Sequence, residues 1–247
     1  KPTAILATNT SSIRIEEIAS QLSSPDRLIG IHFFNPVRQM PLVEVIKTEI
    51  VDIKTENAAY DFVNKIGKLP LPVKSSPGFL VNAVLVPYLQ NSMRSIDGGY
   101  KPEQIDQAMK KWGMPMGPLE LIDVVGLDIL AAAGKTMLKA GDIPQCLKEL
   151  IQNKYLGKKT NKGFYDWNKG KKLKRKYKPL NPTESFQLAE NLISPLIKQT
   201  EKLAKSGVVE SSELADAGVI FGTGFAPFRG GPINYQNQKN NEKIAGI

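Results

Sequence analysis

The first 75 residues alternate between short apolar runs and amphipathic stretches. Apolar runs of strand length occur at 4–10, 27–34, 42–47 and 69–74, and helical periodicity occurs at 13–22 and 51–66. Such alternation indicates part of an α/β sheet domain. About 74 residues would be few for this class, and no Gly-x-Gly-x-x-Gly turn occurs near the start, so we expect a preceding βαβ portion.

From Ser76 onward the pattern predicts helices. They span 77–96, 102–112, 118–139 (one or two helices), 183–206 and 211–221. Two blocks look alike, because each has a long helix, a glycine-containing turn, a short helix with an aspartate (Asp106 or Asp216) and a Gly/Pro-rich knot. The offset of about 110 residues indicates an internal duplication. We therefore expect an α/β domain over 1–75 and two similar helical domains over 76–170 and 171–247.

The composition is that of a globular protein, since 41% of the 247 residues are hydrophobic and 23% are charged. The single cysteine, Cys146, cannot form an intramolecular disulfide, which favours a reducing compartment. No cysteine–histidine cluster has the spacing of a structural zinc site, so no metal is expected. No apolar run reaches the roughly 18 residues of a membrane span, so none is predicted.

The net charge is +9, and much of the excess lies between Lys154 and Lys178. A nucleic-acid patch would explain this charge, but the stretch has few aromatic residues and no groove-reading motif. We favour a solvated linker and expect no nucleic-acid partner. A polyphosphate ligand would benefit from the same field.

The only histidine, His32, lies near the carboxyl end of a predicted strand. Ligands bind beyond the carboxyl ends of strands in open α/β sheets, and histidine exchanges protons near neutral pH. A catalytic base is one interpretation. A structural histidine beside Phe33 and Phe34 is the other.

Glu44 stands in the otherwise apolar run Pro-Leu-Val-Glu-Val-Ile. A buried carboxylate there needs a partner, and His32 lies twelve residues earlier on what could be the adjacent strand. Such a pair would fix the imidazole tautomer and stabilise the imidazolium. Alternatively, Glu44 points to solvent from an edge strand.

Further polar residues stand where a ligand could meet them. Asn9, Ser11 and Asn35 follow predicted strands, where they could orient an uncharged group or could cap helices and turns, with Ser11-Ser12 as the candidate cap of the helix at 13–22. Asn82 falls inside an apolar helical stretch, so its burial would require a hydrogen-bond partner or a ligand.

Several long strings together resemble the 3-hydroxyacyl-CoA dehydrogenases. They are Ala-Thr-Asn-Thr-Ser-Ser-Ile, Ile-Gly-Ile-His-Phe-Phe-Asn-Pro-Val, Pro-Leu-Val-Glu-Val-Ile, Ser-Pro-Gly-Phe-Leu-Val-Asn, Gly-Met-Pro-Met-Gly-Pro-Leu-Glu-Leu-Ile-Asp and Gly-Lys-Lys-Thr-Asn-Lys-Gly-Phe-Tyr. The second helical block, with Gly-Phe-Ala-Pro-Phe-Arg-Gly-Gly-Pro, is similar to that of multifunctional fatty-acid oxidation proteins. The resemblance implies a truncated Rossmann-type NAD-binding domain followed by two similar helical C-terminal domains.

The resemblance also implies an activity, the NAD-dependent oxidation of (S)-3-hydroxyacyl-CoA to 3-ketoacyl-CoA in fatty-acid β-oxidation. His32 would be the general base and Glu44 its partner. Ser11 and Asn35 match positions at the nicotinamide end of NAD or at the reacting oxygen, and Asn82 matches a position near the substrate's reacting centre. Lys159 matches a lysine that reaches NAD.

Beyond the site, the resemblance implies an acyl-CoA substrate, a thiolase subunit as a possible partner and a bacterial-type cytoplasmic location, with a mitochondrial or peroxisomal location as the alternatives. The absence of the dinucleotide fingerprint predicts that residues 1–247 alone bind NAD poorly and are inactive. A 3-hydroxybutyryl-CoA dehydrogenase of butanoate or aromatic-acid metabolism would use the same motifs. A docking or oligomerisation fragment without catalysis is a third alternative, which an intact histidine–glutamate pair disfavours.

Overall fold

The computed structural model describes residues 4–11, 13–137 and 143–244. The chain forms two compact units, one made of 1–83 and 200–247 and the other of 84–199. These units cut across the borders expected at 75 and 170, so the division into three domains stays a prediction. Each unit is described by itself.

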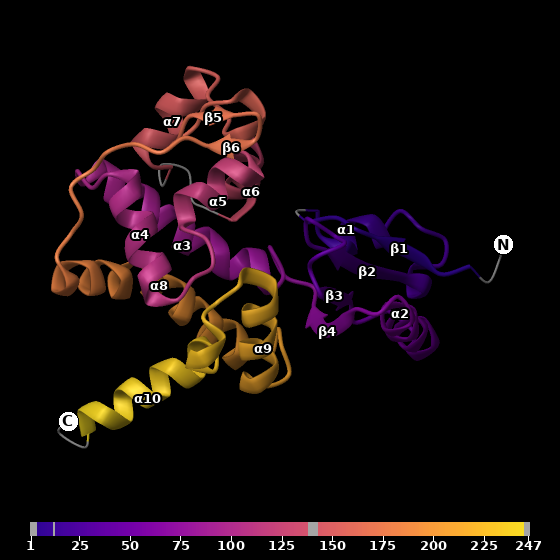
Figure 1. Cartoon of the computed structure of the whole chain (residues 1–247). Helices are drawn as coiled ribbons and strands as arrows, with labels where there is room; N and C mark the ends of the chain where they lie inside the picture. Colours follow the sequence, from indigo (N-terminus) through magenta and orange to yellow (C-terminus); the bar gives the residue numbers. More distant parts are fainter. Residues whose placement is uncertain (1–3, 12, 138–142, 245–247) are drawn as a thin grey trace. The chain divides into compact units, whose positions relative to one another are not determined.

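The first unit contains a mixed sheet of four strands in the order β1-β2-β3-β4 (Figure 1). The strands are β1 (Leu6–Thr8), β2 (Leu28–Phe33), β3 (Leu42–Lys47) and β4 (Leu69–Lys74). β1 pairs parallel with β2, β2 antiparallel with β3, and β3 parallel with β4. The predicted α/β class is confirmed, and β3 is a central strand rather than an edge.

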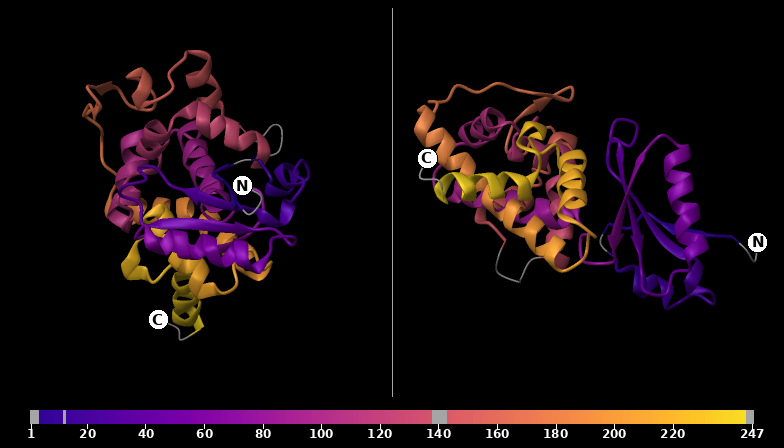
Figure 2. Two further views of the ribbon diagram at one scale, coloured as in Figure 1. Left: turned by 90° about the vertical axis from the view of Figure 1, so that its right-hand side faces the viewer. Right: turned by 90° about the horizontal axis from the view of Figure 1, so that it is seen from below.

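One face of the sheet is covered by α2 (Ile53–Lys65), which runs along the strands in Figure 2. The N-cap residue of α2 is Asp52, whose carboxylate accepts a hydrogen bond from the Thr55 amide (2.6 Å). The buried residues between helix and sheet are Ile29, Ile31, Val43, Val45, Ala59 and Val63. Because side chains alternate along a strand, the even-numbered positions of β2 and β3 face away from α2.

The helix expected at 13–22 is shorter in the structure, where α1 covers Ile15–Ala19. Its N-cap residue is Arg14, which makes no capping side-chain hydrogen bond. Thr10 supports the preceding turn instead, because its hydroxyl accepts from the Ile13 amide (2.9 Å). The predicted cap is therefore wrong for Ser11, and Ser12 lies outside the described residues.

The C-terminal helices of this unit are α9 (Ser212–Thr223) and α10 (Pro232–Ile244). α9 contacts β3, and two of its glycines allow close approach to β4 and to the start of α3. A Cβ at Gly218 would lie 2.6 Å from Leu71 and Leu80 side-chain atoms, and one at Gly222 would lie 2.4 Å from Val81. α9 was predicted at 211–221, whereas α10 was not predicted, because its sequence is mostly polar and shows no clear apolar face.

The second unit is mostly helical, as expected. Its helices are α3 (Val81–Asp97, whose first three residues belong to the first unit), α4 (Pro102–Trp112), α5 (Pro118–Val125), α6 (Leu127–Met137), α7 (Gln145–Gln152) and α8 (Pro182–Lys205, which ends in the first unit). The sequence pattern missed α7. Among the described residues, no helix is both long enough and apolar enough to cross a bilayer.

The basic stretch 154–178 is not simply a linker. Part of it forms a hairpin of β5 (Trp167–Asn168) and β6 (Lys171–Lys172). Phe164, Tyr165 and Trp167 are buried. The linker interpretation is therefore wrong for this part, because the aromatic residues between the lysines pack into the second unit.

Candidate active site

His32 and Glu44 face each other on neighbouring strands. They are directly paired in the antiparallel register of β2 and β3, and Nδ1 of His32 lies 2.8 Å from Oε2 of Glu44. His32 is 5% exposed and Glu44 is 0% exposed. The interpretation of Glu44 as a partner of His32 is confirmed in its geometry, and a solvent-facing Glu44 is excluded.

The second oxygen of Glu44 is held by the backbone. Oε1 accepts hydrogen bonds from the amides of Leu80 (2.9 Å) and Val81 (3.0 Å), where α3 begins. A carboxylate is favoured at a helix N-terminus by the helix dipole. With the Glu44 carboxylate as acceptor, Nδ1 of His32 donates to Oε2, so in the neutral imidazole Nε2 keeps its lone pair.

The turn before α3 aims these amides at Glu44. Gly78 (φ 74°) and Phe79 (φ 53°) are both in the left-handed region, which is strained for a residue such as phenylalanine. The helix expected from Pro77 consequently begins only at Val81. The strain is retained because Phe79 is buried and its two following amides both bind the same carboxylate oxygen.

Two aromatic rings flank the imidazole. Phe34 lies edge-on at 4.8 Å between ring centroids, and Phe79 at 5.6 Å. They restrict the orientation of the His32 ring and exclude water from its sides. Sequence reasoning missed Phe79 as a site residue, although the Pro-Gly turn signal just before it marked an unusual backbone.

The loops that follow β1 and β2 lie at the same edge of the sheet, because the two strands are parallel. The Asn9 side chain accepts a hydrogen bond from the Phe33 amide (2.9 Å), which ties these loops together. Ser11 and Asn35 are both exposed here. Asn9 thus has a structural role, while Ser11 and Asn35 are open to a ligand.

The two remaining predicted residues lie apart in the chain. Asn82 is half-buried in the first turn of α3, next to Val81, whose amide binds Glu44. Lys159 belongs to the second unit, where its exposed ammonium pairs with Asp128 (2.5 Å) and holds the pKa of that carboxyl below its usual value. The roles of Asn82 and Lys159 in binding stay predictions.

The arrangement suits a general base. A neutral imidazole with a free Nε2 lone pair can accept a proton, and the buried Glu44 carboxylate stabilises the imidazolium that results. Among the described residues, no group of three or more His, Cys, Asp or Glu side chains gathers as a metal site would require.

Comparison with known proteins gives two family matches in series. The profile described as "3-hydroxyacyl-CoA dehydrogenase, NAD binding domain" matches residues 1–76, and "3-hydroxyacyl-CoA dehydrogenase, C-terminal domain" matches 78–167. A curated relative named fatty acid oxidation complex subunit alpha, from Vibrio campbellii, is 38% identical over 250 residues, covering 96% of this chain and 35% of the relative. The chain thus spans about a third of the length of the curated relatives it matches.

Two solved structures extend the comparison. The dehydrogenase part of multifunctional enzyme 1 from C. elegans is 30% identical, with a TM-score of 0.64, covering 90% of this chain and 54% of that one. A 3-hydroxybutyryl-CoA dehydrogenase from Escherichia coli has a TM-score of 0.82 over 100% of this chain and 73% of its own. At 23% identity, the second likeness shows the fold alone: a Rossmann-like domain with a helical C-terminal domain.

Proposed function

Because the chain belongs to the 3-hydroxyacyl-CoA dehydrogenase family, we propose that it carries the catalytic base for NAD-dependent oxidation of (S)-3-hydroxyacyl-CoA to 3-ketoacyl-CoA. The observation that carries the proposal is the buried His32–Glu44 pair, with Nδ1 bonded to the carboxylate. The whole longer protein would perform this reaction in fatty-acid β-oxidation, as the name of the Vibrio relative suggests.

In this proposal, Nε2 of His32 takes the proton of the substrate's 3-hydroxyl. Bound NAD would supply the hydride acceptor for C3. Glu44 stabilises the imidazolium formed in that step and, by accepting from Nδ1, keeps Nε2 free to receive the proton. Asn82, half-buried and next to Val81 in the chain, would orient the reacting oxygen through its side-chain amide.

The residues present fit the nicotinamide end of NAD. Ser11 and Asn35 are exposed neutral groups at the carboxyl ends of parallel strands, where this class of sheet binds its ligands. Lys159 would reach the cofactor by exchanging its surface ion pair with Asp128, which is worth at most about 1 kcal/mol. No residue of 1–247 is assigned to the pyrophosphate, since the sequence lacks the glycine fingerprint.

The proposal also includes an internal duplication, in which the second helical block is a copy of the first. Only the first block matches the family's C-terminal profile. Support for duplication comes from the way two helices are connected in each block, which we call the joint. In the first block Asp106 of α4 accepts from two amides at the start of α5, and in the second Asp216 of α9 accepts from two amides at the start of α10.

Two further parts of the proposal concern the longer protein. The word "complex" in the names of the relatives supports a partner subunit, for which a thiolase would be the chemically apt choice because it consumes 3-ketoacyl-CoA. The bacterial source of these relatives supports a cytoplasmic location.

The test compares the longer parent protein as wild type, His32→Gln and Glu44→Gln, following the loss of NADH absorbance with acetoacetyl-CoA. Both variants should lose about 10²–10⁴-fold in kcat, since one removes the base and the other leaves an amide N–H facing donors. Asp61→Asn, an exposed carboxyl-to-amide change on α2, is the matched control and should keep full activity. Equal activity of His32→Gln and wild type would contradict the proposal.

A further inference from the structure

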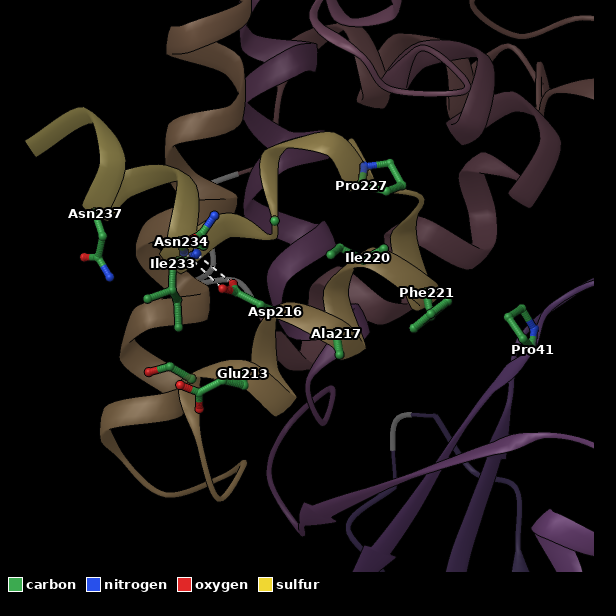
Figure 3. A pocket seen from close by; sticks show the side chains of 12 residues that line it. Pro41, Glu213, Asp216, Ala217, Ile220, Phe221, Pro227, Ile233, Asn234 and Asn237 are labelled. Carbon is green, nitrogen blue, oxygen red and sulfur yellow. Dashed lines mark hydrogen bonds between the residues drawn. The ribbon is translucent and has the colours of Figure 1, made fainter. Parts of the chain in front are cut away.

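An open groove lies along α9 and α10, with a volume of about 820 Å³ (Figure 3). It is built entirely from the first unit. Its lining is mostly apolar, and its polar side chains are those of Ser212, Glu213, Asp216, Asn234 and Asn237. The apolar lining residues are Pro41, Ala217, Ile220, Phe221, Pro227 and Ile233.

The groove has a counterpart in the same chain, because α4–α5 and α9–α10 are joined alike. Asp106 accepts from the amides of Leu119 (2.9 Å) and Glu120 (3.0 Å). Asp216 accepts from those of Ile233 (2.7 Å) and Asn234 (3.0 Å).

A glycine makes room for the aspartate in both joints. A Cβ at Gly117 would lie 2.2 Å from the Asp106 side chain, and a Cβ at Gly231 would lie 2.3 Å from that of Asp216. Counted from the amides that the aspartates accept from, the residues three and four positions later in α5 and in α10 therefore lie on equivalent helix faces.

The α4–α5 groove is filled by residues 163–167. The Tyr165 hydroxyl donates to Asp106 (2.7 Å), and the Phe164 and Tyr165 amides donate to Asp123 (2.9 Å each). The Trp167 indole also donates to Asp123 (2.8 Å). These donors and their rings are buried, so the segment forms part of the core of the second unit.

The α9–α10 groove differs from its counterpart in the donors to Asp216 and in the exposure of Asn237. Among the described residues, Asp216 accepts only from its two backbone amides, although it is 7% exposed. Asn237 occupies the place that Asp123 has in α5, three residues after the second capped amide, and it is exposed. Like its counterpart, the groove offers a buried aspartate as acceptor, and no side chain of the described residues donates to it.

We propose that the α9–α10 groove binds an extended peptide segment that carries a tyrosine, with its hydroxyl donating to Asp216 and its aromatic neighbours on the apolar lining. The chemistry is that of Gly-Phe-Tyr at 163–165 in the first block. A second copy of this chain is a poor source, because its own Tyr165 is buried. The inference rests on the proposed duplication and is independent of the dehydrogenase reaction.

The first experiment uses a fluorescent synthetic peptide with the sequence of residues 160–172 and the chain 1–247, followed by anisotropy. We expect saturable binding, weakened about tenfold or more when the tyrosine is replaced by phenylalanine, since a hydrogen bond to a charged group contributes about 1.5–3 kcal/mol. The tyrosine and phenylalanine peptides have the same charge, so attraction between their lysines and Glu213 cannot account for a difference in their binding.

Two variants of the chain locate the binding. Ala217→Trp fills the groove without touching the Asp216 hydrogen bonds and should abolish binding, whereas Gln238→Trp, on an exposed position outside the groove, should leave it unchanged. No saturation at millimolar peptide, equal binding of the two peptides, or full binding by Ala217→Trp would each overturn the proposal. Because no turnover is measured, these outcomes are separate from failure of the NADH assay.

Discussion

Glu44 shows how one side chain organises the candidate site. Each of its oxygens is committed, one to the His32 imidazole and the other to two amides of the turn before α3. The fully buried carboxylate of Glu44 thus accepts from three donors, and these satisfy its hydrogen-bonding capacity. The orientation of the imidazole is therefore fixed before any ligand arrives.

The single histidine permits a direct test of that orientation. In ¹⁵N-labelled chain at pH 8, the ring should be the Nδ1–H form, with Nε2 showing the shift of an unprotonated nitrogen, because Glu44 accepts from Nδ1. In Glu44→Gln the preference for the Nδ1–H form should be lost, because an amide N–H can face Nδ1 in place of the acceptor oxygen, while Asp61→Asn should retain it. A wild-type spectrum of the Nε2–H form would refute the assigned geometry.

Asp106 provides a prediction about pH. Burial raises its pKa to about 6 from the ordinary 3.8, despite hydrogen bonds from Tyr165 and from backbone amides that act in the opposite direction. A carboxyl group with a raised pKa in the folded state contributes stability below about pH 4, and this contribution is lost as the pH rises through about 6. Asp106→Asn lacks this titration.

The urea midpoints of wild type and Asp106→Asn should therefore be compared between pH 4 and pH 7. Wild type should lose stability relative to the variant over this interval. A difference between the two midpoints that stays constant with pH would show that Asp106 titrates normally.

At the scale of secondary structure, the start of a helix depends on which groups accept hydrogen bonds from its first amides. α3 begins four residues later than its apolar pattern predicts, because the left-handed Gly78 and Phe79 turn the backbone toward Glu44. α10 has little amphipathic character of its own and is held through Asp216 at its first turn. Both helices start where a distant carboxylate accepts their free amides.

The glycine at the α4–α5 joint should accordingly be intolerant of a side chain. Gly117→Ala places a Cβ against Asp106 and should lower the free energy of unfolding by about 1–3 kcal/mol, as overpacking does. Gly98→Ala, where the nearest atoms are 3.5 Å from the new Cβ and φ is not positive, is the control and should be neutral or stabilising. Urea unfolding measures both, and equal midpoints for the two variants would contradict the close approach.

For the whole molecule, the net charge of +9 is concentrated in one region. Residues 154–178 contain eleven of the 33 basic residues and one of the 24 acidic ones. Part of this charge is anchored to aromatic rings, with the ammonium groups of Lys162 and Lys172 4.3 Å from the rings of Tyr155 and Tyr165. The basic region is thus partly folded structure, which its composition did not reveal.

We predict that the isolated chain is a monomer. β1 is the first strand of the sheet order and has only three residues, and such a short edge is a poor template for pairing with another sheet. Like charge among chains opposes association further. Sedimentation velocity at micromolar concentration should give a single monomeric species, and a well-defined dimer would overturn this expectation.

Elements with strong periodicity, such as β3, β4 and α4, were predictable from the sequence alone, and their bounds match the structure to the residue. The sequence also singled out His32 and Glu44, because a lone histidine at a strand end and a carboxylate in an apolar run are visible without coordinates. These features depend on neighbours within a few positions. Four features came from tertiary contacts: the register that pairs His32 with Glu44, the start of α3, the burial of Phe164, Tyr165 and Trp167, and the Asp216 hydrogen bonds that hold the start of α10. Each depends on contacts between residues far apart in the chain, whose energies no local pattern contains.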